Sequence, residues 1–164
     1  MLCHAKSSQV QSNIDDIDGP LNNRRCGVSR KIAQFKSEEG LTADPVLCSS
    51  TRCARETLDQ LSPALIGEPA ILFDSAFYRT DPCALLYRLR AVSKDVEQVL
   101  VIGHNPSNSD LASMIVNGGA REGVNSMTKK FPTAALAILN LGISWLGVGP
   151  DCATLDRLIT PSDF

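Results

Sequence analysis

Hydrophobic residues are arranged along the chain in two different patterns, and each pattern predicts one kind of element. Val28, Ile32 and Phe35 fall on one face of a helix that ends near Gly40. Continuous apolar runs instead predict buried strands, as at 99–102, where no polar residue interrupts the run. The predicted strands are 45–48, 70–73, 99–102, 134–141 and 153–159. The later predicted helices are 50–61 with Ser50 as its cap, 82–92 with Asp81 as its cap ahead of Pro82, and 105–117, which Gly118 and Gly119 stop.

The segments between these elements are polar or rich in glycine. The polar composition of residues 9–20 predicts a loop. The glycine-rich, charged composition of residues 118–132 predicts a mobile stretch. Strands that alternate with helices indicate the α/β class, in which helices cover both faces of a largely parallel sheet. The length of 164 residues fits a single domain that spans 1–164.

Composition narrows the range of functions. The net charge of −2 lacks the basic excess of a general nucleic-acid binder. No apolar run reaches the roughly 18 residues of a bilayer span, and the N-terminus has no signal segment. We therefore expect no nucleic-acid or membrane partner. The cysteines form no C-x-x-C pair and predict reduced thiols in a cytoplasmic protein. They lie at positions 3, 26, 48, 53, 83 and 152.

The chain has only two histidines, and each lies where a strand-like run meets a turn or a helix. His4 follows Leu2 and Cys3, and His104 follows the apolar run that ends in Gly103. In parallel sheets, functional sites form at the carboxyl ends of the strands. Imidazole is suited to accept and pass on a proton or a phosphoryl group near neutral pH. The placement therefore predicts that His4 and His104 share one site.

Several segments also follow the order and separation of known motifs, and together they cover nearly the whole chain. They are His-Ala-Lys-Ser-Ser at 4–8, Pro-Leu-Asn at 20–22, Asp-Pro-Val-Leu-Cys-Ser-Ser at 44–50, Ala-Arg-Glu-Thr at 54–57, the second histidine motif at 99–106, Phe-Pro-Thr-Ala-Ala-Leu-Ala at 131–137 and Pro-Ser-Asp at 161–163. In these segments the chain resembles the histidine phosphatase superfamily, specifically its small bacterial SixA-type phosphohistidine phosphatases.

The resemblance implies a fold and a reaction. The fold is a phosphoglycerate-mutase-like three-layer α/β/α sandwich around a mostly parallel sheet. In the reaction His4 attacks phosphorus and becomes a phosphohistidine, which water hydrolyses, while His104 hydrogen-bonds the phosphoryl group. Ser49 and Asn105 are further candidate substrate contacts. The resemblance implies no metal or other cofactor, and it implies a phosphorylated histidine protein or a small phosphoryl donor as partner in signal transduction.

The chain departs from the family at the positions that grip phosphate. Two arginines normally complete the pocket, because forked guanidinium groups suit phosphoryl oxygens. One stands directly before the first histidine, where this chain has Cys3. The other stands four residues after a serine and before Ala-x-x-Thr, where this chain has Cys53. A third arginine is replaced by Gly19. Arg52 flanks the second position and could reach inward if the local turn shifts.

The first strand is also short. The family's first histidine follows a buried central strand of about five residues, but only Met1, Leu2 and Cys3 precede His4. We therefore expect a truncated first strand, either as a stub or because the true start lies upstream.

These departures leave more than one function open. The leading prediction is a SixA-type phosphatase that is impaired by the loss of both arginines. The alternative is a pseudophosphatase that keeps the fold as a binding module. A third possibility is a zinc site of Cys3, His4, Cys53 and His104, although Cys3 and His4 are neighbours and point to opposite faces of a strand. Asp74 is either a turn residue or a proton donor.

Overall fold

The computed structural model describes residues 1–3, 23–78 and 80–164. The predicted loop at 9–20 lies outside this range. Within it the strands are β1 Leu2–Cys3, β2 Pro45–Ser49, β3 Ala70–Asp74, β4 Leu100–Gly103, β5 Val116–Gly119, β6 Leu136–Leu141 and β7 Ala153–Ile159. The α-helices are α1 Asn23–Glu38, α2 Arg52–Leu61, α3 Pro82–Arg90, α4 Ser107–Ile115 and α5 Arg121–Lys130. None of these helices has the length and apolar character of a bilayer span.

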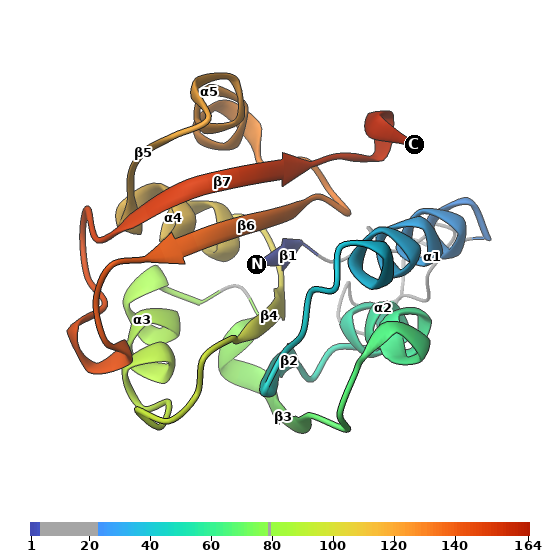
Figure 1. Ribbon diagram of the computed structural model, residues 1–164, viewed down its shortest axis with the longest axis horizontal. Coiled ribbons are helices and arrows are strands. Elements are labelled where there is room, and N and C mark those ends of the chain that lie inside the picture. The colour runs from blue at the N-terminus through green and yellow to red at the C-terminus, as the bar shows by residue number, and fades with distance from the viewer. Residues whose placement is uncertain (4–22, 79) are drawn as a thin grey trace, which may run out of the picture.

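All the strands belong to one sheet with the order β3-β2-β4-β1-β6-β7-β5 (Figure 1). The pairs β3–β2, β2–β4, β4–β1 and β7–β5 are parallel, while β6 is antiparallel to both of its neighbours. The prediction of a mostly parallel sheet is therefore confirmed.

Alternate residues of the central strands build two separate cores, one on each face of the sheet. Leu2, Val46 and Ile102 belong to the core under α1 and α2, which contains Ile32, Leu58 and Leu61. Their neighbours Cys3, Leu47 and Val101 belong to the core under α3, α4 and α5, which contains Leu85, Leu111 and Met127. Figure 1 shows the two groups of helices on opposite sides of the strands. The three-layer α/β/α sandwich is confirmed.

The predictions were wrong on both sides of Gly118 and Gly119. The helix predicted at 105–117 is α4, which ends at Ile115, and residues 116–119 form β5 beside β7. Gly119 has a φ of +119°, and a Cβ there would lie 2.0 Å from the carbonyl oxygen of Leu155. The stretch predicted to be mobile contains α5, whose Met127 is buried. Here glycine permits a close approach of two strands rather than a helix end.

The helix cap predicted from the sequence is confirmed at α3 and is wrong at α2. Asp81 accepts a hydrogen bond from the backbone N–H of Cys83 at 2.7 Å and caps α3, as predicted. Ser50 does not cap α2, because the N-cap residue is Thr51 and its side chain makes no capping bond. The hydroxyl of Thr51 instead points to the buried side chains described below.

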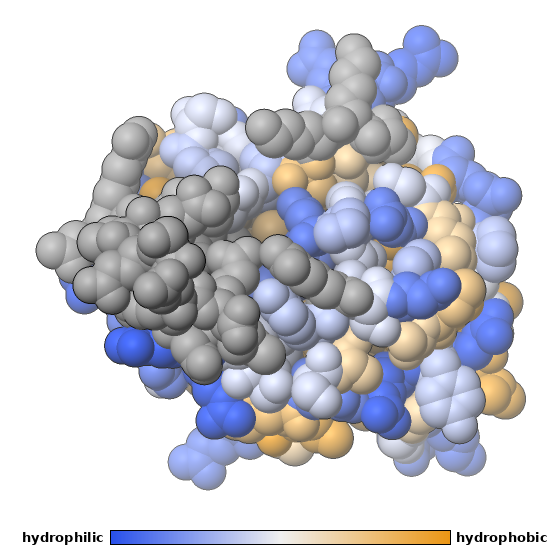
Figure 2. All heavy atoms as spheres, turned by 180° about the vertical axis from the view of Figure 1, so that it is seen from behind, coloured by the Kyte–Doolittle hydropathy of each residue, from blue (hydrophilic) through white to orange (hydrophobic). Residues whose placement is uncertain are grey.

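Among the residues that the structure describes, no strand pairs with the outer side of β3. β3 pairs with β2 over its whole length, and its other side is the end of the sheet. Ile71, Leu72 and Phe73 are exposed, although the apolar run had the pattern of an interior strand. Hydrophobic atoms lie along the lower rim of the molecule in Figure 2, the rim at which Figure 1 places β3.

The two-residue strand β1 joins the two halves of the sheet, and a cavity lies beside it. Leu2 pairs with Ile102 of β4 and Leu136 of β6. Beyond Met1 a cavity of about 730 Å³ lies between the two flanking strands, with apolar side chains of α3, β4 and β6 on its wall. The α-amino group of Met1 donates to the carbonyl of Ala137 at 2.6 Å. Burial lowers the pKa of this amino group from 8.0 to about 5.

We predict that a chain beginning at Met1 becomes more stable as the pH rises from 5 to 8. The unfolded amine binds a proton below pH 8 and the folded amine only below about pH 5, so the unfolded state holds more protons between them. Three pKa units correspond to about 4 kcal/mol of unfolding free energy. Urea denaturation across this pH range measures the slope.

The matched controls carry three residues ahead of Met1, which turn the amine into an amide. Val-Ile-Val and Ser-Gly-Ser extensions should both lose the part of the slope that comes from the amine. Only the apolar extension should also raise the stability at pH 8, because it buries side chains in the cavity. An unchanged slope in both extended chains would show that the amine is not buried.

Candidate functional site

The carboxyl ends of four parallel strands meet at one edge of the sheet. β1 ends at Cys3, which pairs with Gly103 at the end of β4. β2 ends at Ser49, which pairs with Asp74 at the end of β3. The residues that directly follow these ends are therefore brought together from distant parts of the chain. His104 follows Gly103, and Thr51 and Cys53 follow Ser49.

His104 lies at the centre of this edge and is 5% exposed. Its Nε2 lies 3.1 Å from Oγ1 of Thr51 and 3.3 Å from Sγ of Cys53. Thr51 and Cys53 are themselves 3.5 Å apart between Oγ1 and Sγ. The ring of Tyr78 packs edge-on against the imidazole, with centroids 5.0 Å apart and planes at 89°. The imidazole is thus oriented by a hydroxyl, a thiol and an aromatic ring.

The turn that carries His104 is braced against β1. The backbone N–H of Asn108, in α4, donates to the carbonyl of His104 at 2.9 Å. The Asn108 side-chain amide donates to the carbonyl of Leu2 at 3.0 Å. A Cβ at Gly103 would lie 2.5 Å from Oδ1 of Asn108, so only glycine leaves room for this side chain. The same asparagine therefore positions both the end of β1 and the start of the His104 turn.

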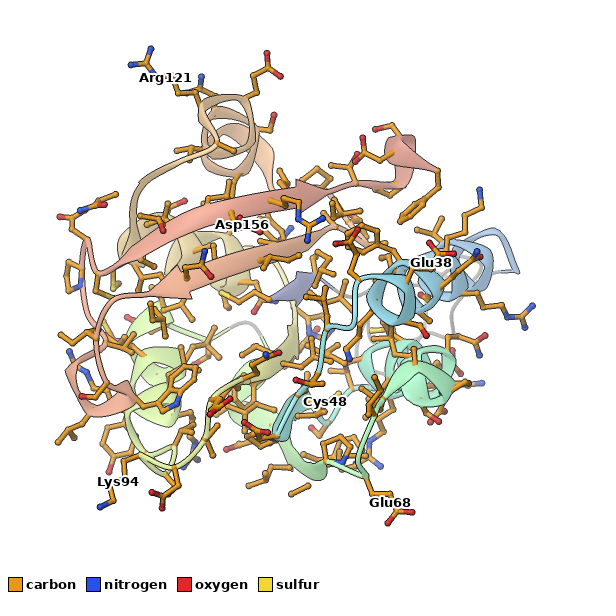
Figure 3. The ribbon with its side chains drawn as sticks, viewed as in Figure 1. Glu38, Cys48, Glu68, Lys94, Arg121 and Asp156 are labelled. Atoms are coloured by element: carbon orange, nitrogen blue, oxygen red, sulfur yellow. The ribbon has the colours of Figure 1, made fainter. Side chains whose placement is uncertain are left out.

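Buried thiols occupy two of the predicted substrate-binding positions. Cys3 and Cys53 are both buried. Burial raises the pKa of the Cys3 thiol to about 12, backbone hydrogen bonds from Ala134 and Asn105 oppose this shift, and the nearby Cys53 adds to it. Cys48, on β2 in Figure 3, also has its pKa raised to about 12, chiefly by burial. Cys3 therefore brings no charge to this edge near neutral pH.

The arginines on either side of Cys53 are directed elsewhere. Arg52 is half exposed and forms an ion pair with Glu56 at 2.7 Å, one helical turn along α2. Arg55 donates to the carbonyl of Ser50 at 2.9 Å and lies over the ring of Phe73, 4.4 Å from its centroid. The possibility that Arg52 turns inward is therefore not realised in this structure.

The remaining candidates have structural partners. Ser49 donates from Oγ to Oγ1 of Thr51 at 3.4 Å and so supports the turn into α2. The Asn105 side-chain amide donates to the carbonyl of Phe131 at 2.7 Å, which ties the segment ahead of β6 to the site. Asp74 accepts from the N–H of Ala76 at 2.8 Å and pairs with Arg88 at 2.7 Å. These contacts favour the turn-residue interpretation of Asp74.

The structure therefore shows the relative positions of some of the predicted site residues but not of all of them. The structure brings Cys3, Cys53 and His104 to one edge, whereas His4 lies outside the described residues. Thr51 and Tyr78 were not predicted; the position of Thr51 two residues after a strand end could have indicated it, but no sequence signal singles out Tyr78. Among described residues no cluster of three or more His, Cys, Asp or Glu side chains could bind a metal ion, so the zinc alternative depends on His4.

Comparisons with known proteins place this geometry in context. No family model matches the chain. The uncharacterized protein Rv1276c of Mycobacterium tuberculosis is 30% identical over 154 residues, which are 93% of this chain and 94% of that protein. The uncharacterized protein ML1117 of Mycobacterium leprae is 30% identical over 162 residues, 96% of this chain and 98% of that protein.

Solved structures of SixA proteins have the same fold. The SixA protein from Nakamurella multipartitia superimposes with a TM-score of 0.84 at 20% identity, covering 98% of this chain and 93% of its own. The protein histidine phosphatase SixA in complex with tungstate has a TM-score of 0.80 at 21% identity, covering 99% and 96%. The chain therefore belongs to the family of the two mycobacterial proteins, and its fold is that of the SixA-type members of the histidine phosphatase superfamily.

Proposed function

We propose that this chain is a SixA-type phosphohistidine phosphatase with low turnover. The observation that carries the proposal is the buried His104 at the carboxyl edge of the sheet, beside the end of β1, in a SixA fold. His4 follows Cys3 directly in the sequence. The paired ends of β1 and β4 are therefore the two points from which the histidines of such a site would come.

The proposed reaction has two steps. The imidazole of His4 attacks phosphorus, an N–P bond forms, and the bond to the leaving group breaks as that group takes up a proton. Water then attacks the same phosphorus, the N–P bond breaks, and inorganic phosphate leaves. His104 donates a hydrogen bond to a phosphoryl oxygen in both steps. The catalytic contribution of the protein is thus positioning and the neutralisation of negative charge.

Charge neutralisation is the part that this chain lacks at two positions. Cys3 is a neutral thiol, and Cys53 has no guanidinium to offer. Removing one preorganised donor from such a site costs on the order of 10² to 10³ in kcat. Two losses should cost more, although effects within one site are not additive. The chemistry therefore remains possible but slow.

The proposed substrate is a phosphorylated histidine protein or a small phosphoryl donor. One of the similar SixA structures contains tungstate, a tetrahedral oxyanion that resembles phosphate in shape. A phosphoramidate such as phosphohistidine also asks less of the site than a phosphate ester, because its nitrogen leaves readily once it is protonated. We expect phosphohistidine to be turned over faster than an aryl phosphate for this reason.

A second candidate is a pseudophosphatase that binds phosphoryl groups without turnover. One specific observation favours it: Nε2 of His104 already contacts both Thr51 and Cys53. A ring nitrogen that already has partners in its own protein gains less from a phosphoryl oxygen. The two candidates differ in whether phosphate is released, which the following predictions measure.

We predict that Cys3→Arg and Cys53→Arg together raise the hydrolysis of an aryl phosphate by about two orders of magnitude or more. The substituted guanidinium groups would supply the charge that the site lacks. The native chain should show barely detectable hydrolysis, which phosphate release at saturating substrate measures.

Cys83→Arg is the control, because Cys83 is an exposed cysteine on α3 and the substitution adds one positive charge, half of what the double variant adds. It should leave hydrolysis unchanged. Native turnover at a rate typical of the family would refute the assignment of Cys3 and Cys53 to the arginine positions. A folded double variant that binds phosphate but releases none from the substrate would favour the pseudophosphatase.

We further predict that phosphate binds weakly and that its binding strengthens as the pH falls from about 8 to about 5.5. Imidazolium would then replace part of the missing charge. The same protonation would block His4 as a nucleophile, so turnover should fall while binding rises. Calorimetric titration of the native chain and of His4→Ala measures the trend. Tight binding that is independent of pH and survives in His4→Ala would place the anion elsewhere.

A further inference from the structure

The two edges of the sheet differ in how they are protected. β5 is short, contains Gly118 and Gly119, and has α5 packed beside it and its neighbour β7. β3 has five residues in continuous register with β2, without a bulge. It carries no lysine and no proline between Ala70 and Asp74. Natural proteins use short strands, bulges, lysine, proline or a covering element to keep an edge from pairing, and among the described residues β3 has none of these devices.

The side chains of β3 are apolar on both faces of the open edge. Ile71 and Phe73 pair with Val46 and Cys48, whose side chains face α2, whereas Leu72 pairs with Leu47 on the opposite face. Ile71, Leu72 and Phe73 are 44%, 51% and 46% exposed. A single exposed apolar residue is ordinary, but three in succession on an unpaired strand mark an interaction surface.

We propose that β3 pairs in antiparallel orientation with β3 of a second copy of the chain, so that the two sheets become one. When the twofold axis passes through the middle residue, Leu72, every residue of the strand lies opposite a residue of the other copy. It sets Ile71 of each copy opposite Phe73 of the other, which is an aromatic–aliphatic cross-strand pair on both sides of the axis. The exposed apolar side chains on each face of the strand would then cover one another.

The charges at the two ends of β3 disfavour two of the other registers. Asp74 of one copy lies opposite Ala70 of the other when the axis passes through Leu72. Moving the axis to Ile71 would set Asp74 opposite Glu68, and moving it to Asp74 would set the two Asp74 carboxylates opposite each other. Like charges directly opposite are unfavourable. Glu68 extends outward from the lower rim in Figure 3, beyond the start of β3.

The size of the β3 surface determines how strongly the two copies should associate. A strand of five residues, with Arg55 of α2 beside Phe73, is small compared with the interfaces of obligate dimers. The dimer should therefore form in a concentration-dependent way. The pairing does not depend on the proposed enzymatic activity, since β3 has no part in the chemistry assigned to His4 and His104.

Sedimentation velocity of the full chain from about 1 µM to about 1 mM tests the proposal. The native mass should rise from 17.6 kDa toward twice that value. Leu72→Lys sets two ammonium groups opposite each other and should weaken association by about tenfold or more. Leu146→Lys is the matched control, because Leu146 is 78% exposed at residues 145–147, outside β3, and this variant should dimerise as the native chain does.

Hydrogen exchange of the β3 amides is the second measurement and needs no variant. Protection of these amides that increases together with the dimer supports the proposal. A native chain that stays monomeric throughout the range overturns it, as does a Leu72→Lys chain that dimerises like the control. Protection of β3 in a purely monomeric sample also overturns it, because another segment of the same chain would then cover the edge.

Discussion

The pairing of β1 between β4 and β6 is the contact on which the rest of the structure depends. β1 has two residues, yet it joins the half sheet β3-β2-β4 to the half sheet β6-β7-β5. Its parallel register with β4 sets Cys3 beside Gly103. Asn108 secures this register by donating to Leu2, and only a glycine at 103 leaves space for it. The same few residues therefore hold both the central strand and the turn that carries the candidate site.

The shortness of β1 has an energetic consequence at the opposite end of the strand. The α-amino group of Met1 takes the place that a peptide N–H would have in a longer strand, and it donates to Ala137. A peptide group loses little when it is buried with a partner, whereas an ammonium loses its hydration. Burial therefore lowers the pKa of this amine, and the cavity next to it has apolar side chains of β4 and β6 on its wall.

At the candidate site, the fold is that of the SixA structures, while two of the predicted substrate-binding positions hold cysteines. Cys3 and Cys53 fill buried positions with small side chains, and a buried thiol needs no counter-charge, so the packing of the sheet edge is kept. His104 remains oriented by Thr51, Cys53 and Tyr78. Stability and chemistry thus rest on different residues here, which is why a shared fold alone does not establish a shared rate of reaction.

The sequence by itself determined the strands at 45–48 and 99–102, the capped start of α3 at Asp81 and the placement of His104 at a strand end, because hydrophobic runs and caps are local signals. It could not reveal β5, since Val-Asn-Gly-Gly has little strand propensity and becomes a strand only by pairing with β7. Nor could it show that the apolar run of β3 lies at an exposed edge. Tyr78 and Thr51 meet His104 through contacts between segments far apart in the chain, and such contacts are decided by tertiary packing alone.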